Sequence, residues 1–126
     1  MPLVRISLKQ GKSKDFKQKV GEIIFHAMID IIKVPIHDIF QILTEHDSHS
    51  LIYDSTYLDI QRTPSIIVIQ ITLNEGRTVE LKKLLYQTIA ERLHSGLDVR
   101  RGDVFISLVE VKKVNWSFGN GIAQYA

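Results

Sequence analysis

The chain repeats itself at a spacing of 65 residues, and this repeat constrains its fold more than any other feature. The segment GKSKDFK at 11–17 matches GRTVELK at 76–82 in the order glycine, base, hydroxyl, any residue, acid, apolar residue, lysine. Further pairs share the same register without any insertion: Ile6 with Ile71, Leu8 with Leu73, Val34 with Val99, Asp38 with Asp103, Phe40 with Phe105, Leu43 with Leu108, and Glu45 with Glu110. We interpret the chain as two copies of one supersecondary unit, roughly 2–45 and 67–110.

Each copy has the pattern of a strand, a helix and a second strand. β-Branched residues dominate LVRISL at 3–8 and SIIVIQITL at 65–73, which predicts a strand in each. Ser13 and Thr78 are predicted helix N-caps, because an acidic residue and a helical apolar stripe follow each of them. The segments DIFQILTE and DVFISLVE then return as strands, each parallel to the strand that opens its copy.

Two such units predict an α+β fold, in which a pseudo-two-fold axis relates two βαβ units that form a four-stranded mixed sheet with two helices on one face. Pro35 and Gly96 are expected to end the helices. The strands look apolar on both faces, so we expect the face without helices to pack against other copies of the chain. The connection at 46–64 is predicted to be a loop with a short helical turn. The end of the chain, 114–126, is predicted to be a turn or short hairpin within a single domain spanning 1–126.

Composition narrows the classes of function. The chain contains no cysteine, which excludes disulfides and thiol catalysis and suits a cytoplasmic protein. Its net charge of +2 is too small to indicate a nucleic-acid partner. No apolar run approaches the roughly 18 residues of a membrane span, so no membrane association is expected.

The pseudo-two-fold axis brings three reactive groups to one end of the predicted sheet, where two strands begin and a third finishes. We call this end a rim. The first strand would be antiparallel to the third and parallel to the second. Pro2 at the start of the first strand, Asp38 before the second and Arg77 after the third therefore meet at one rim. The repeat places their equivalents at the opposite rim: Ile67, Asp103 and Lys12.

Pro2 becomes a secondary amine if Met1 is removed, as is usual before a small residue. Burial and the nearby cation Arg77 would lower the pKa of that amine, and a neutral amine can take a proton from carbon beside a carbonyl. Asp38 could instead hydrogen-bond the amine and raise its pKa, which favours a general acid, or it could activate water. Arg77 can hold a substrate carboxylate through a bidentate pair. Without these neighbours, Pro2 would simply begin a strand where its missing N–H costs nothing.

These features together resemble the tautomerase superfamily and, within it, the malonate semialdehyde decarboxylase branch. The matching segments run nearly end to end and include MPLV at 1–4, VPIHD at 34–38, GRTVELKKLLY at 76–86 and NWSFGNGIAQY at 115–125. The resemblance implies an enzyme with a catalytic amino-terminal proline, assembled as a homotrimer. It implies a small carboxylate substrate and neither a cofactor nor a metal.

Carried over by position, the resemblance implies roles for individual residues. Pro2 is the implied catalytic amine, Asp38 the carboxylate that works with it, and Arg77 the group that binds the substrate carboxylate. Trp116 and Phe118 are implied to form an apolar wall of the pocket.

The chain departs from the decarboxylase pattern at one position. Two arginines flank this turn in the decarboxylases, whereas here the first of them falls on Asn74 or Glu75 in LNEGR, which makes Asn74 a candidate for substrate binding. The loss favours keto–enol tautomerisation of a small α-keto or unsaturated carboxylic acid, with Pro2 as the base. A decarboxylase or hydratase of a three-carbon acid is the first alternative, and a non-catalytic trimeric binding protein is the second.

Four other polar side chains have less specific interpretations. His37 lies beside Asp38 and could reach the rim. The resemblance puts Arg62 near a trimer contact, although an exposed arginine is an equally good interpretation. His46 and His49 are three residues apart without a third ligand, so they are expected to be solvated rather than to bind a metal.

Overall fold

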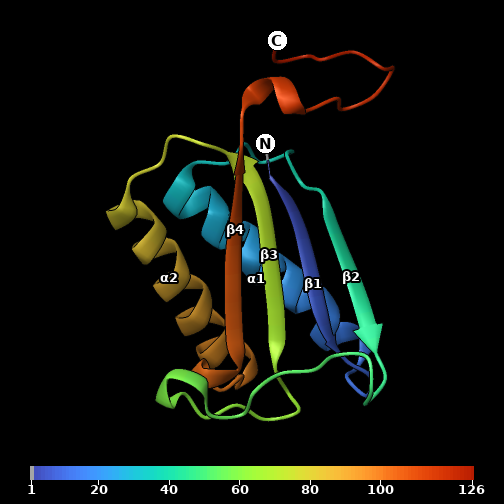
Figure 1. Ribbon diagram of the computed structural model, residues 1–126, viewed down its shortest axis with the longest axis vertical. Coiled ribbons are helices and arrows are strands. Elements are labelled where there is room, and N and C mark those ends of the chain that lie inside the picture. The colour runs from blue at the N-terminus through green and yellow to red at the C-terminus, as the bar shows by residue number, and fades with distance from the viewer. Residues whose placement is uncertain (1) are drawn as a thin grey trace.

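The computed structural model describes residues 2–126 and consists of two βαβ units that share one sheet. The first unit contains β1 (Leu3–Lys9), α1 (Lys14–Ile32) and β2 (Gln41–His46), and the second contains β3 (Ile67–Asn74), α2 (Val79–Leu97) and β4 (Val104–Val111). The strand order is β2-β1-β3-β4, and both helices lie on one face of the sheet (Figure 1). The predicted α+β fold with a four-stranded mixed sheet is therefore confirmed.

The strand register shows that the sequence repeat is also a structural repeat. β1 and β3 are antiparallel at the centre of the sheet, with Leu3 opposite Thr72. Each of them has its own parallel partner, and the paired residues lie 37 positions apart in both cases, as with Val4 and Gln41 and with Ile67 and Val104. This equality is what a pseudo-two-fold axis between the two units requires.

Both helices begin as the sequence predicts. The hydroxyl of Ser13 accepts a hydrogen bond from the backbone N–H of Phe16 at 3.0 Å, and the hydroxyl of Thr78 accepts one from Leu81 at 3.2 Å. Each bond satisfies a backbone donor that has no partner within the first turn of a helix.

The predicted end of the second helix is wrong by two residues. α1 ends at Ile32, and its C-cap, Lys33, has the left-handed conformation with φ of 60°, two residues before Pro35. α2 continues through Gly96 and ends at Leu97, and its C-cap, Asp98, is the equivalent of Lys33, with φ of 56°. Gly96 has a packing role instead, because a Cβ atom there would lie 3.2 Å from Cδ1 of Ile23 on the neighbouring helix.

The hydrophobic core lies between the helices and the inner face of the sheet. Its members include Val4, Ile6, Leu8, Ile24, Met28, Ile67, Ile69, Ile71, Leu73, Leu85, Ile89 and Leu93. The expectation that the strands are apolar on both faces is wrong in detail, because the apolar residues alternate and most of them point inward. The outer face mixes apolar and polar side chains: Leu3, Arg5, Ser7, Val68, Gln70, Thr72, Phe105, Ser107 and Val109.

The two segments outside the repeats lie at opposite ends of the strands (Figure 1). The connection between the units contains a short turn, η1 (Tyr57–Asp59), where a helical turn was predicted, although Leu58 within it has left-handed angles, with φ of 60° and ψ of 29°. η2 (Arg101–Asp103) precedes β4. The C-terminal segment contains η3 (Lys113–Asn115) followed by turns, and it extends from the edge where the chain begins. None of the helices within residues 2–126 has the length and apolar character needed to cross a membrane.

Candidate active site

Pro2 precedes β1, Asp38 precedes β2 and Arg77 follows β3, so the strand directions bring the three residues to the same end of the sheet. In Figure 1 this is the upper end, where the N label stands. Pro2 is buried and directly precedes β1, where the next residue, Leu3, pairs with β3. The N–H of Val4 donates to the carbonyl of Phe40 at 3.0 Å, which draws the segment after Asp38 alongside the start of β1. Pro2 has a free amine only if Met1 is removed, and Met1 lies outside the described residues.

Asp38 is a buried carboxyl group, with 7% of its surface exposed. Its backbone N–H donates to the carbonyl of Pro35 at 2.9 Å, so a tight turn after α1 fixes its position. Burial raises the pKa of Asp38, although the positive amino terminus of the chain opposes this shift. A buried carboxyl group with a raised pKa can exchange a proton with a neighbouring base.

Arg77 is held at this rim by the backbone of the preceding turn. It follows Gly76, whose φ of 120° belongs to the left-handed region that glycine favours. One guanidinium nitrogen, Nη1, donates to the carbonyl of Asn74 at 3.0 Å, and the side chain is half-buried. The guanidinium group has further donors with which to bind a carboxylate.

The C-terminal segment supplies the aromatic side chains of the rim. Trp116 and Phe118 stack with their ring centroids 5.5 Å apart, and Tyr125 packs edge-on against Phe118 at 5.0 Å. The indole N–H of Trp116 donates to Oδ1 of Asn74 at 2.8 Å. Asn74 thus binds Trp116 through its side chain and Arg77 through its backbone, so it links the aromatic cluster to the cation.

Sequence reasoning did not anticipate the link between Asn74 and Trp116 or the contribution of Tyr125. The clustering of aromatic residues with glycines in NWSFGNGIAQY was the available signal, because it indicates a packed turn rather than a disordered end. The partner of Trp116 was not detectable, since Asn74 is 42 residues away in the sequence.

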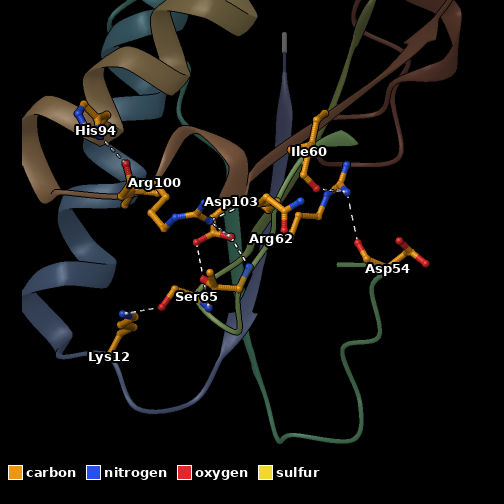
Figure 2. Close-up of polar contacts among 11 residues, drawn as sticks. Lys12, Asp54, Ile60, Arg62, Ser65, His94, Arg100 and Asp103 are labelled. Atoms are coloured by element: carbon orange, nitrogen blue, oxygen red, sulfur yellow. Dashed lines mark hydrogen bonds and ion pairs between the residues drawn. The ribbon is translucent and has the colours of Figure 1, made fainter. Parts of the chain in front are cut away.

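The opposite rim holds Ile67 and Asp103, the equivalents of Pro2 and Asp38, and their surroundings differ from those at the first rim. Figure 2 shows the contacts of Asp103. Ile67 is part of the core and carries no free amine. Asp103 is fully buried, and it accepts hydrogen bonds from the backbone N–H of Thr63 at 2.7 Å and from its hydroxyl at 2.6 Å. Arg100 also lies 3.4 Å from Oδ1 of Asp103. The connection between the repeats therefore closes this position.

The structure also places the other polar side chains that the sequence singled out. His37 is exposed in a turn next to Asp38. Arg62 organises the connection, because its Nη1 donates to the carbonyls of Asp54, Tyr57 and Ile60 at 3.0–3.2 Å (Figure 2). No cluster of three or more potential metal ligands occurs within residues 2–126.

Comparisons with known proteins agree on one family. Two family models described as "Tautomerase enzyme" match, one over residues 2–58 and the other over residues 38–119. A probable tautomerase of Bacillus subtilis (strain 168), YusQ, is 45% identical over 124 residues, which covers 98% of each chain.

Solved structures show the same fold. A crystal structure of FG41 malonate semialdehyde decarboxylase inhibited by 3-bromopropiolate has a TM-score of 0.91 at 36% identity, and the match covers 98% of this chain and 93% of that one. A fused 4-OT described as a symmetric trimer has a TM-score of 0.78 at 22% identity, with coverage of 95% and 94%. The second similarity supports the fold alone.

Proposed function

This chain belongs to the tautomerase family, and we propose on that premise that it catalyses keto–enol tautomerisation of a small α-keto or unsaturated carboxylic acid, with Pro2 as the base. The observation that carries the proposal is the burial of Pro2 at the rim that also holds Asp38 and Arg77. A buried amine near a guanidinium cation has a lowered pKa, because both effects disfavour its protonated form. Such an amine is neutral near pH 7 and can accept a proton from carbon.

In this proposal the residues divide the work. Arg77 binds the substrate carboxylate and orients the carbon–hydrogen bond toward the Pro2 nitrogen. The amine takes the proton as the enolate forms, and the resulting ammonium returns a proton to the other end of the conjugated system. Trp116 and Phe118 exclude water from one side of the bound acid, which strengthens the electrostatic interactions within the site.

Asp38 is proposed to set the protonation state of Pro2. When Asp38 is ionised it stabilises a cationic Pro2, and when it is protonated this stabilisation is lost. Because burial raises the pKa of Asp38, its neutral form is more accessible than that of an exposed aspartate. The same pair can therefore favour either a neutral Pro2 that acts as a base or a cationic Pro2 that acts as an acid. The charge that the bound substrate brings to the site decides between the two states.

A second candidate function is decarboxylation or hydration of a three-carbon acid. It is favoured by the 36% identity to a malonate semialdehyde decarboxylase over nearly the whole chain. In this alternative, a cationic Pro2 acts as the acid and Asp38 activates water. We rank it second because Asn74 binds Trp116 through its side chain and supplies no second guanidinium group.

We also propose that the protein is a homotrimer, as the fused 4-OT structure is described to be. The exposed apolar residues Phe105 and Val109 on the outer face of the sheet support self-association. Sedimentation equilibrium on the purified protein tests this. A monomer at micromolar concentration would contradict the proposal.

The first test of the proposed function is the intact mass of the purified protein, before and after exposure to a halopropiolate. We expect Met1 to be absent and a single adduct to map to Pro2. Arg77→Gln should slow the labelling without moving it, because the reagent carries a carboxylate. If Met1 is retained, or if Pro2 stays unmodified, the proline mechanism is wrong and the non-catalytic binding protein is favoured.

A further inference from the structure

A cavity of about 550 Å³ opens at the rim opposite Pro2, outside the site described above. Its lining includes Leu8, Lys9, Lys12, Phe16, His46 and Ser65. We call it the distal pocket. Its volume lies within the range of small-molecule sites, and its walls combine apolar side chains with a few polar groups, as such sites do.

The charged groups of the distal pocket favour an anion. The ammonium nitrogen of Lys12 lies 3.4 Å from the hydroxyl of Ser65 (Figure 2). The same nitrogen lies 5.2 Å from the centre of the Phe16 ring. The ammonium of Lys9 lies over the ring of Tyr53. Within residues 2–126, neither lysine takes part in an ion pair with an acidic side chain.

One acidic side chain, Asp47, also lines the distal pocket. Its carboxylate accepts a hydrogen bond from the backbone N–H of His49 at 2.9 Å, so it is already engaged within its own turn. The pocket therefore presents two ammonium groups against one carboxylate, and the balance is positive.

His46 offers a polar atom that the protein does not use. Its Nε2 is buried and makes no hydrogen bond within the described residues, whereas its Nδ1 lies 3.4 Å from the hydroxyl of Ser50. A buried polar atom without a partner is costly. Because Nε2 is closed to solvent, an acceptor oxygen in the pocket satisfies it only when the His46 ring turns toward the pocket that it lines, in the tautomer that carries hydrogen on Nε2. A carboxylate provides that oxygen together with the negative charge that the lysines favour.

The repeat explains why such a pocket exists at this end. Lys12 is the equivalent of Arg77, and Ile67, which also lines the pocket, is the equivalent of Pro2. The cation is preserved, whereas the amine is replaced by an aliphatic side chain. We propose that the distal pocket binds a small organic carboxylate reversibly, without proton transfer. This proposal does not depend on catalysis at Pro2.

The test is a titration of the ¹⁵N-labelled Arg77→Gln protein with benzoate, followed by amide chemical shifts. This background weakens binding at the Pro2 rim and leaves the distal pocket intact. We expect saturable shifts at residues 10–12 and 46–48. Adding Lys12→Gln should weaken this binding about tenfold or more, the effect of losing a charge-assisted contact. Lys83→Gln, which removes an exposed charge on α2, should leave it unchanged.

Three outcomes would overturn the proposal. The first is the absence of saturable shifts around Lys12 and His46 in the Arg77→Gln protein. The second is equal affinity of the Lys12→Gln and Lys83→Gln variants for benzoate. The third is equal affinity for benzamide, which has the same shape without the charge. Lys12 is exposed, so its replacement leaves the fold intact, as a circular dichroism spectrum should verify.

Discussion

Asp38 and Asp103 occupy equivalent positions in the two repeats but have different environments. Asp103 is enclosed by the connection between the repeats, and its carboxylate accepts two hydrogen bonds from Thr63. Asp38 is 7% exposed in the turn that leads from α1 to β2, and burial raises its pKa. The same position in the fold is therefore tied to the connection in one repeat, and in the other it holds the carboxyl group that we propose acts with Pro2.

Asp38→Asn is expected to raise the melting temperature at pH 7 and to lower kcat/KM. Because the pKa of Asp38 is raised in the folded protein, the folded state binds its proton more tightly than the unfolded state does. Stability from this group is therefore lost as the pH rises above the ordinary value of 3.8. Replacement by a neutral amide removes that loss.

The pH dependence of the melting temperature checks this assignment. The advantage of the variant should be largest near neutral pH and should disappear as the pH falls to about 3.8 or below, where Asp38 is protonated. Asp54→Asn is the control, because backbone hydrogen bonding lowers the pKa of Asp54 and the expected change has the opposite sign. A variant of Asp38 that is less stable than the wild type at pH 7 would contradict the argument.

Thr63→Val should destabilise the protein by about 1.5–3 kcal/mol, the value of a hydrogen bond to a charged group. The substitution removes the hydroxyl that donates to Asp103 at 2.6 Å and keeps the shape of the side chain. Urea unfolding at a fixed protein concentration measures the change. Thr56→Val, in the exposed part of the connection, should cost little. Equal effects of the two substitutions would show that the Asp103 network does not hold the connection in place.

The repeat made much of this fold predictable from the sequence. The equal spacing of both halves, the caps at Ser13 and Thr78 and the β-branched strands all indicated the same architecture, and the pseudo-two-fold axis then placed Pro2, Asp38 and Arg77 at one rim. Each of these inferences depends on local patterns or on symmetry.

Long-range contacts of single side chains were not predictable in this way. The bond between Trp116 and Asn74 and the enclosure of Asp103 by Thr63 depend on how segments outside the repeats pack. Gly96 was misread for a related reason. Glycine commonly ends helices, but here its small size allows the close approach of Ile23 from the other helix.

Arg77→Gln is expected to lower kcat/KM for a keto acid by about tenfold to a hundredfold, mainly through a higher KM. The physical reason is the loss of a charge-assisted contact to the substrate carboxylate. Steady-state kinetics with the acid and with its methyl ester separate this effect from a general loss of structure, because the ester carries no carboxylate for Arg77 to bind. Lys83→Gln is the matched charge control. An equal loss for acid and ester would rule out this role for Arg77.

Asn74→Leu should release the C-terminal aromatic cluster from the rim. The substitution removes the acceptor of the Trp116 indole N–H, whereas Asn74→Asp keeps an acceptor oxygen at the same place. Trp116 is the sole tryptophan in the chain, so its fluorescence reports this contact directly. We expect a red-shifted emission and a higher KM in the leucine variant, and near wild-type emission in the aspartate variant. Unchanged emission in Asn74→Leu would show that the bond does not position Trp116.

Pro2→Ala should lower kcat/KM for the tautomerisation of an aromatic α-keto acid by about a hundredfold, toward the low end of the general-base range of about 10²–10⁴. The loss stays modest because alanine still provides an amine, although a primary one that lacks the rigid ring. A matched variant with an uncleaved residue before Pro2 has no basic nitrogen at this position and should lose more. Full activity in that second variant would exclude Pro2 as the group that moves the proton.

The pH profile of the wild-type enzyme then decides between base and acid. If neutral Pro2 is the active form, kcat/KM increases as the pH rises through the pKa of the amine. If cationic Pro2 is the active form, as in the decarboxylase alternative, kcat/KM decreases over the same range. Asp38→Asn removes the carboxylate that stabilises the cation, so it should shift either limb to lower pH. If the limb of the profile does not move in Asp38→Asn, Asp38 does not influence the pKa of Pro2 and its role is purely structural.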